Sequence, residues 1–193
     1  MARSRSFDKA DALDRAMRLF WRHGYEGTSI EDLTAELGVA KPSLYAAFGN
    51  KRALFELALD RFAALAGAGV ERALAEPRAE DVARRFLQGY VDVPEGQPRG
   101  CLLVQSALAC SAASAEVQAA VAERRRVPEQ LLAERLARAQ KEGDLPPDAR
   151  PAELARYLAT VAQGLAVQAT GGATAAELRG VADLALMAWP KRG

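Results

Sequence analysis

The sequence is poor in the residues from which catalytic and metal sites are built. It contains one histidine and two cysteines in 193 residues. Cys101 and Cys110 form no CxxC motif, and with His23 alone they make no zinc-binding set. The chain also lacks a nucleophile beside a base, a phosphate-binding glycine loop and paired carboxylates in an apolar setting. We therefore expect a protein that is not an enzyme and that holds neither a metal nor another cofactor.

The two cysteines leave two interpretations open. At about 100° per residue they would point to opposite sides of one helix, so they cannot bond to each other within it. A buried structural thiol is the expectation for each. A redox role for Cys101 or Cys110 is the alternative.

Long apolar runs and an excess of charge are missing as well. No apolar stretch approaches the roughly 18 residues of a membrane-spanning helix, and no apolar segment follows the charged amino terminus as in a signal peptide. These absences favour a soluble protein of the cytoplasm without membrane contact. Lys and Arg number 26 against 25 Asp and Glu, so binding to nucleic acid requires a local face rather than overall charge.

Helical periodicity runs through the sequence and strand alternation does not, so the predicted fold class is all-α. Apolar residues recur at three and four positions between residues 8 and 23, and Gly24 ends that helix. Pro128 either kinks or splits the segment from 114 to 142. The other helices predicted for the carboxy-terminal part cover residues 79–92, 101–112, a segment from Ser114, 150–170 and 174–189.

A first short helix is predicted just after Gly24. The stretch Thr28 to Glu31 fits a capping box, with Thr28 as the cap. Gly38 ends this helix. Its buried stripe is formed by Ile30, Leu33 and Leu37.

A second short helix follows almost at once. Pro42 suits its first turn, because the missing N–H has no partner there in any case. Leu44 and Phe48 face inward. Helices this short are marginal alone and must dock on neighbours. The pair forms a helix-turn-helix, a unit whose second helix can enter the major groove of DNA.

Polar residues remain on the exposed face of the second helix. Lys41, Ser43 and Tyr45 are donors that can meet phosphates and base edges, and Lys51 follows at the start of the next helix. Thr28 and Ser29 offer a phosphate seat at a helix amino terminus. The acidic residues of the first short helix, Glu31, Asp32 and Glu36, are expected to lie away from this face. The alternative is that Tyr45 packs inside and the lysines are merely solvated.

This stretch resembles the tetracycline-repressor (TetR) family of bacterial transcription regulators. The resemblance implies an all-helical homodimer with a helix-turn-helix DNA-binding domain over residues 1–50 and a larger ligand-binding and dimerisation domain over 51–193. It also implies repression. By matching position, Thr28, Ser29, Tyr45 and Lys51 take the phosphate roles, and Lys41, Pro42 and Ser43 lie nearest the bases. The matching residues are Phe20, Gly24, Tyr25, Gly27, Thr28, Ser29, Ile30, Leu33, Gly38, Val39, Lys41, Ser43, Leu44, Tyr45, Phe48, Lys51 and Leu54.

Three positions depart from the family's usual pattern. Thr34 stands where alanine is usual, Pro42 where glycine is frequent, and Ala46-Ala47 where larger polar or aromatic residues are common. Fewer side chains then reach the DNA, so sequence reading is expected to depend on Lys41, Ser43 and the shape of the groove.

A connector helix is predicted from Lys51 to about Ala75, with an inward stripe at Leu54, Ala58, Phe62 and Leu65. Beyond it, the amide of Gln105 sits in an apolar helix and must be bonded to something. Its partner is either a neighbouring backbone carbonyl or a ligand. In the second case the predicted pocket residues are Phe62, Phe86, Tyr90, Gln105 and Tyr157, and the ligand is a small, largely apolar inducer.

The last two helices are predicted to form the homodimer. Each carries an apolar stripe, so two such hairpins can make a four-helix contact around a two-fold axis. Two heads then bind a palindromic double-stranded operator together. A dimeric small-molecule-binding protein without DNA recognition is the alternative function. The two stripes are Leu154, Leu158, Val161, Leu165 and Leu178, Val181, Leu184, Leu186, Trp189.

Overall fold

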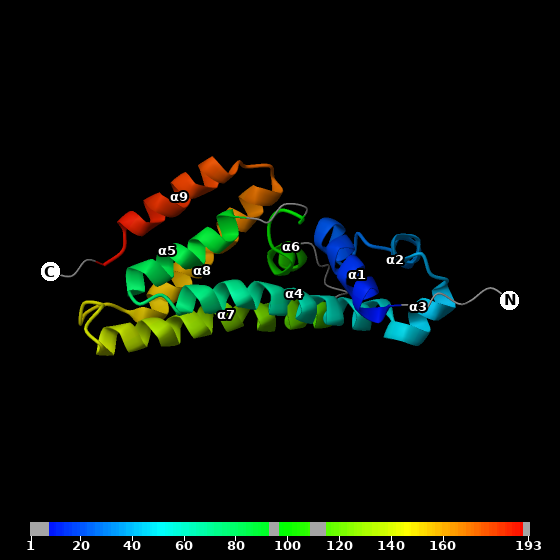
Figure 1. Cartoon of the computed structure of the whole chain (residues 1–193), viewed down its shortest axis with the longest axis horizontal. Coiled ribbons are helices and arrows are strands. Elements are labelled where there is room, and N and C mark those ends of the chain that lie inside the picture. The colour runs from blue at the N-terminus through cyan, green and yellow to red at the C-terminus, as the bar shows by residue number, and fades with distance from the viewer. Residues whose placement is uncertain (1–7, 93–96, 109–114, 191–193) are drawn as a thin grey trace.

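The computed structural model describes residues 8–92, 97–108 and 115–190. In these ranges all regular structure is helical and no strand is found, which confirms the all-α prediction. The molecule is elongated, with a small head at one end (Figure 1). The head consists of α1 (Lys9–His23), α2 (Ile30–Leu37) and α3 (Lys41–Phe48).

A long connector helix, α4 (Lys51–Leu74), leads from the head into the body (Figure 1). The body helices are α5 (Ala79–Val91), α6 (Leu102–Leu108), α7 (Ala115–Lys141), α8 (Pro151–Thr170) and α9 (Ala175–Met187). α7 runs through Pro128 as one helix, so of the two alternatives, a kink or a split, the split does not occur. The predicted boundary between the helices at 101–112 and Ser114 falls outside the described residues, as does Cys110. None of the helices that the structure describes combines the length and apolarity that a bilayer crossing needs.

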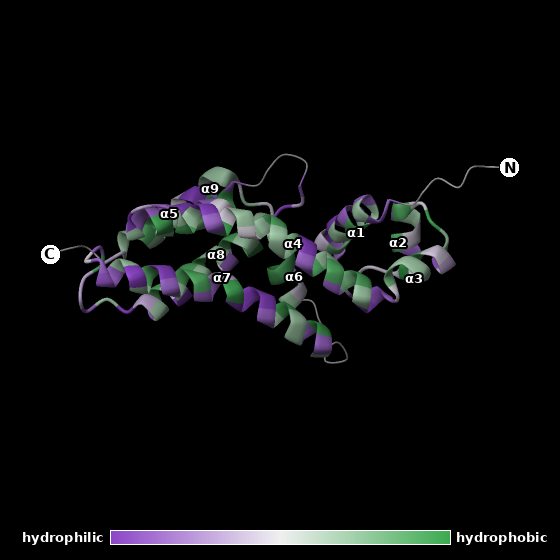
Figure 2. Cartoon of the chain, turned by 60° about the horizontal axis from the view of Figure 1, so that its bottom comes forward, coloured by the Kyte–Doolittle hydropathy of each residue, from purple (hydrophilic) through white to green (hydrophobic). Residues whose placement is uncertain are grey.

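Two hydrophobic clusters hold the molecule together. The junction cluster joins the head to α4, α6 and the start of α7, and the body cluster joins α5, α7, α8 and α9. Figure 2 shows hydrophobic residues gathered where α4, α6 and α8 meet. The short α2 and α3 are stabilised because they bury Leu33, Leu37, Leu44 and Phe48 in the junction cluster.

The inward stripe predicted for the connector is only partly right. Leu54, Ala58 and Phe62 are buried, but Leu65 is 45% exposed. After Phe62 the next fully buried residue of α4 is Ala73. The reason is that the junction cluster ends at Phe62 and the body cluster begins near Ala73, so the middle of α4 crosses between two cores.

The stripes predicted for dimerisation also need correction. Leu158, Leu165, Leu178 and Trp189 are buried inside the protomer, where they complete the body cluster. Their apolar faces are therefore used within one chain. The apolar residues that α8 and α9 leave most exposed are Val167, Val181, Leu184 and Met187.

One arginine stabilises the end of the connector. Arg135 of α7 is 7% exposed. Its guanidinium donates to the carbonyl oxygens of Leu74, Glu76 and Pro77 at 3.1, 2.8 and 3.0 Å. A helix leaves its last carbonyls without intrahelical partners, so Arg135 supplies donors where the chain turns from α4 to α5.

We expect Arg135→Met to lower the free energy of unfolding by about 2 to 4 kcal/mol, because three part-buried carbonyls lose a charged donor group. Urea denaturation followed by circular dichroism measures the loss. The matched control is Arg138→Met on the same helix, whose side chain is 63% exposed and pairs with Glu142. Equal stability of the two variants would contradict a capping role for Arg135.

Candidate nucleic-acid interface

The turn between α2 and α3 depends on one glycine. Gly38 has φ +68° and ψ +34°, in the left-handed region that favours glycine. Its N–H donates to the carbonyl of Thr34 at 2.9 Å, and the N–H of Val39 reaches the same oxygen at 3.2 Å. These bonds end α2 and set the direction in which α3 leaves. α3 then starts with Lys41 and Pro42 in its first turn, as predicted.

The cap of α2 lies one residue later than predicted. Ser29 is the N-cap, and its partner in the capping box is Asp32: the Asp32 N–H donates to Ser29 Oγ at 3.0 Å, and the Ser29 N–H donates to Asp32 Oδ2 at 2.8 Å. Thr28 is instead fully buried, and its hydroxyl donates to the carbonyl of Gly24 at 2.8 Å. The Thr28 hydroxyl therefore points into the protein, toward the end of α1. This orientation argues against the predicted contact between Thr28 and phosphate.

α3 separates its residues cleanly between two faces. Leu44 and Phe48 are 2% and 5% exposed and pack in the junction cluster. Tyr45 is 40% exposed, so the alternative in which it packs inside is wrong. The other exposed residues of α3 are Lys41, Pro42, Ser43 and Ala46.

An acid lies closer to this face than predicted. Glu31 of α2 forms an ion pair with Lys41, with 3.3 Å between Oε1 and Nζ. Backbone hydrogen bonding at the start of α2, followed by Lys41, lowers the pKa of Glu31, so this carboxylate is charged at neutral pH. The expectation that the acids of α2 lie elsewhere is wrong for Glu31. Both side chains are largely exposed, so the pair can exchange for a phosphate.

Lys51 is held in place by aromatic neighbours. Its Nζ lies 4.4 Å from the centroid of the Tyr25 ring, a cation–π distance. The Tyr25 ring in turn contacts Phe55 at 5.0 Å between centroids. Burial lowers the pKa of Lys51, and the charges of Glu26 and Asp32 oppose that shift. Lys51 is thus oriented at the start of α4, beside the amino end of α2.

The residues predicted for a ligand pocket are not all neighbours. Phe86 and Tyr90 contact each other, with ring centroids 5.6 Å apart. Phe62 contacts Trp21 at 4.7 Å in the junction cluster, and Tyr90 packs against both clusters. Tyr157 lies apart from them at the surface, where it is 37% exposed.

Hydrogen bonds explain two of these positions. The Gln105 amide donates to the Arg99 carbonyl at 3.1 Å and to Thr170 Oγ1 at 3.0 Å, so the backbone-carbonyl alternative is confirmed. The Tyr157 hydroxyl donates to the Ala185 carbonyl at 2.9 Å, which ties α8 to α9. Cys101 is buried, and its burial raises the pKa of the thiol. Cys101 therefore stays protonated at neutral pH, as a structural thiol does.

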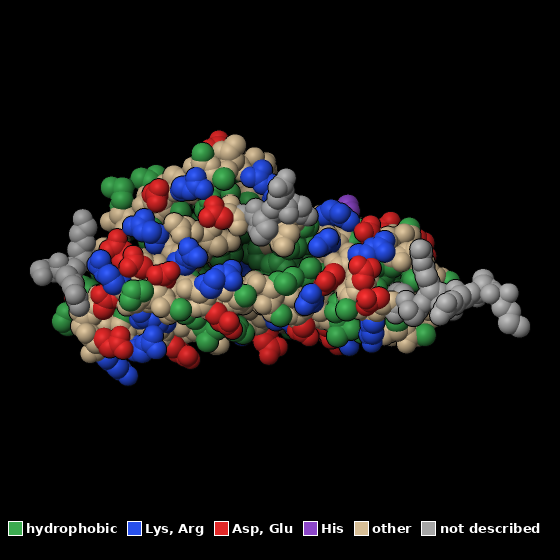
Figure 3. Space-filling view, in the orientation of Figure 1, with side chains coloured by type: hydrophobic (Ala, Val, Ile, Leu, Met, Phe, Trp, Pro, Cys, Tyr) green, Lys and Arg blue, Asp and Glu red, His purple; other side chains and the backbone are tan. Residues whose placement is uncertain are grey.

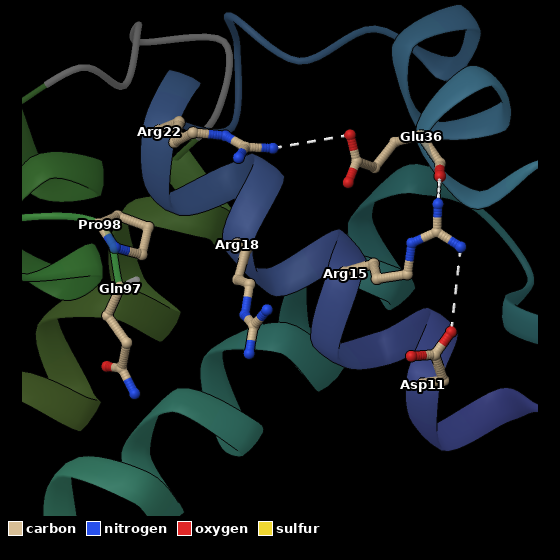
Figure 4. A pocket seen from close by; sticks show the side chains of 7 residues that line it. All are labelled: Asp11, Arg15, Arg18, Arg22, Glu36, Gln97 and Pro98. Carbon is tan, nitrogen blue, oxygen red and sulfur yellow. Dashed lines mark hydrogen bonds and ion pairs between the residues drawn. The ribbon is translucent and has the colours of Figure 1, made fainter. Parts of the chain in front are cut away.

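A separate groove of about 660 Å³ runs along α1 at the junction of head and body (Figure 4). Its arginines are already partly paired: Arg22 lies 3.6 Å from Glu36, and Arg15 lies 3.9 Å from Asp11. None of the predicted pocket residues borders it. The lining residues are Asp11, Arg15, Arg18, Arg22, Glu36, Gln97 and Pro98.

Two family models match almost the whole chain. Residues 12–58 match the model described as bacterial regulatory proteins of the tetR family, and residues 62–184 match the model of the tetracyclin repressor-like C-terminal domain. The chain belongs to the TetR family. It is therefore a helix-turn-helix transcriptional regulator, as its exposed α3 indicates. The two matches meet inside α4, and the boundary at residues 50 and 51 stays a prediction.

Known TetR-family proteins are similar over their full length. The chain is 33% identical to the HTH-type transcriptional repressor ComR of Escherichia coli K12 over 193 residues, or 98% of this chain and 92% of ComR. A cysteine mutant of the TetR family regulator CifR, solved with 26-bp double-strand operator DNA, is 38% identical with a TM-score of 0.92, covering 98% of this chain and 100% of that one. A putative TetR regulator from Rhodococcus is 41% identical with a TM-score of 0.64, covering 94% and 99%.

Removing the acid beside Lys41 tests the interface. We expect Glu31→Gln to tighten binding to a duplex selected from random sequence by about three- to tenfold, because Lys41 loses its competing partner and the phosphates lose a negative neighbour. Fluorescence anisotropy measures the dissociation constant. Glu71→Gln makes the same charge change on an exposed residue of α4 and should leave the dissociation constant unchanged. Equal affinity of Glu31→Gln and wild type would show that Lys41 lies away from the DNA.

Proposed function

We propose that this protein is a repressor that binds a palindromic operator as a homodimer and leaves it when a small molecule binds the body. One observation carries the proposal: Lys41, Ser43 and Tyr45 are exposed together on α3, and none of the helices that the structure describes covers them. Such a face suits the major groove. A small-molecule binder without DNA recognition has no use for it, so that alternative is the weaker one.

We assign the DNA contacts as follows. Lys41, Pro42 and Ser43 lie nearest the bases, and Ser29, Tyr45 and Lys51 bind phosphates. Thr28 is left out because it is buried. Pro42 and Ala46 are small, so α3 can approach the groove closely, and the shape of the groove then contributes to sequence reading.

The arrangement of head and body supports the same function. The chain superposes on the operator-bound CifR mutant with a TM-score of 0.92 over 98% of its length. A match this close over both parts supports a head position that is competent for DNA. We place the protein in the cytoplasm and assign it no catalytic activity, because its relatives ComR and CifR are transcription regulators.

The dimer is proposed to form through the exposed apolar residues of α8 and α9. Val181, Leu184 and Met187 are 51%, 66% and 75% exposed and recur every three residues on α9. Figure 3 shows hydrophobic side chains on the outer surface of α9. Val167 extends the apolar surface on α8. Burial of such a strip against its symmetric copy removes it from water.

Dimerisation explains how a nearly neutral protein can hold DNA. One head offers few phosphate contacts, whereas two linked heads bind as a unit. If each head neutralises about three or four phosphates, the logarithm of the binding constant falls with that of the salt concentration at a slope of roughly −5 to −7. The two heads of the dimer can stand at different distances from each other. A ligand that binds one of these arrangements better than the other shifts the equilibrium between them, and α4 transmits the change to the heads.

The DNA contact is tested with lysine variants. We expect Lys51→Ala to weaken binding to the selected duplex and to reduce the salt slope by about 0.9 for each head, because Lys51 is the lysine assigned to a phosphate and that contact is lost. Titrations at several salt concentrations measure both quantities. Lys141→Ala, at the exposed end of α7, is the control and should change neither. A slope that is unaffected by Lys51→Ala would contradict the phosphate contact assigned to Lys51.

The dimer surface is tested by placing a charge in it. Leu184→Glu should produce monomers in sedimentation velocity, because two glutamates would be buried near the two-fold axis. Leu131→Glu is the matched control, since Leu131 is 39% exposed on α7 and lies outside the proposed surface. A Leu184→Glu protein that sediments like wild type would rule out this surface.

A further inference from the structure

Arg125 is a charged residue of the body that pairs with no acidic group among the residues that the structure describes. It lies half-buried on α7, and its Nη2 donates to Gln163 Oε1 of α8. Its Nε is buried and has no hydrogen-bond partner in the described part of the chain. Interior charges are normally paired, because an isolated one loses its hydration without compensation.

Other arginines of the same helix show what Arg125 lacks. The neighbouring Arg124 donates to Asp60 Oδ1 through Nε and Nη2, at 2.8 and 2.6 Å. Arg135 donates to three backbone carbonyls. Within the described ranges, the acceptor that Arg125 bonds is a neutral one, the side-chain amide oxygen of Gln163. Arg135 Nη1 is also buried without a partner there, but the rest of that guanidinium is bonded to the three carbonyls. In that part of the chain Arg125 makes fewer hydrogen bonds than either arginine, so its guanidinium has donors left for a further acceptor.

Within residues 8–92, 97–108 and 115–190, the titratable groups on which the charge of Arg125 acts do not supply an anion. Its charge acts on Tyr90 and on Cys101, so both lie within its electrostatic reach. Burial raises the pKa of the Tyr90 phenol and of the Cys101 thiol. Both groups therefore remain protonated and neutral near pH 7.

Besides Arg135 Nη1, which lies further along α7, two buried donors of other helices have no partner among the described residues. They are Trp21 Nε1 of α1, in a residue that is 6% exposed, and Ser106 Oγ of α6, in a residue that is fully buried. α6 packs against α1, α7 and α8, so these donors and Arg125 belong to helices that meet at one place. Buried donors without partners are rare in folded proteins and indicate a missing acceptor.

Aromatic side chains of the core lie near these donors, in the junction cluster and, through Tyr90, in the body cluster. Phe62 packs edge-on against Trp21, and Phe86 packs against Tyr90. A hollow with hydrophobic side chains opens between head and body, at the place that α6 occupies in the same view (Figures 1 and 3). A ligand that carries a hydrogen-bond acceptor can therefore bury an apolar part here at little cost in free energy.

We propose that Arg125 binds the carboxylate of an amphipathic effector, whose apolar part packs against the aromatic residues of the junction. The proposal rests on the proposed function and specifies the largely apolar inducer as one with an anionic end. Arginine suits this role, because its guanidinium is always charged and forms strong hydrogen bonds to carboxylates. The effector would contact α1, α6 and α7 together, and so influence how the head sits on the body.

The direct test is a panel of aliphatic carboxylates from butanoate to decanoate, with phenylacetate, each compared with its neutral amide at equal concentration and constant chloride. We expect carboxylates to raise the melting temperature of the wild-type protein by binding the folded state, and the amides to have little effect. In calorimetric titration, Arg125→Met should raise the dissociation constant of the carboxylate by about 10- to 100-fold. Arg124→Met is the matched control and should bind it as wild type does.

Three results would overturn the proposal: stabilisation by no carboxylate of the panel, equal binding of the amides, or wild-type affinity in Arg125→Met. Unliganded Arg125→Met should melt no lower than wild type, because an unpaired interior charge is replaced by an apolar group. A loss as large as that of Arg135→Met would instead make Arg125 structural and would also overturn it.

Measurements of DNA binding distinguish failure of the carboxylate proposal from failure of the proposed repressor function. Unliganded Arg125→Met should bind the selected duplex like wild type, and the carboxylate should then change the affinity of wild type alone. If wild type binds no duplex, the proposed function fails, while the thermal and calorimetric results still decide whether Arg125 binds a carboxylate. If the saturating carboxylate leaves the wild-type affinity unchanged, the effector role is excluded.

Discussion

The structure depends on how the connector α4 is held between head and body. Two adjacent residues of α4 face opposite partners: Arg61 pairs with Asp14 of α1 at 2.6 Å, and Asp60 pairs with Arg124 of α7 at 2.6 Å. Both pairs are partly exposed, so apolar packing around Phe62 supplies most of the stability and the ion pairs set the register. A shift of α4 against the body must therefore also move the head.

The head is consequently not an independent unit. Its core continues into α6 and the start of α7 through a single hydrophobic cluster. A molecule that binds beside α6 touches the same packing that orients α3. This continuity gives a physical route by which events in the body reach the DNA-binding face, without any contact between effector and DNA.

Sequence patterns predicted the fold well and the site in part. The helical spacing of apolar residues and the positions of the glycines located the helices, because helix formation depends on residues that are neighbours along the chain. The outward direction of Tyr45 followed from Leu44 and Phe48, which must face the core. The cap of α2 was misplaced by one residue, since the Thr28 hydroxyl is taken by the carbonyl of Gly24. The Lys41–Glu31 pair was missed because it joins two helices across a turn.

Local chemistry along the chain was thus enough to establish an all-helical protein, its helix-turn-helix and its outward polar face. Contacts between distant segments settled the remaining points. Leu158 and Leu178 are core residues because α8 and α9 pack on α5, and no periodicity distinguishes a face buried within one chain from a face buried between two. Arg125 differs from Arg124 only through what lies opposite each side chain, and that is set by how the helices pack.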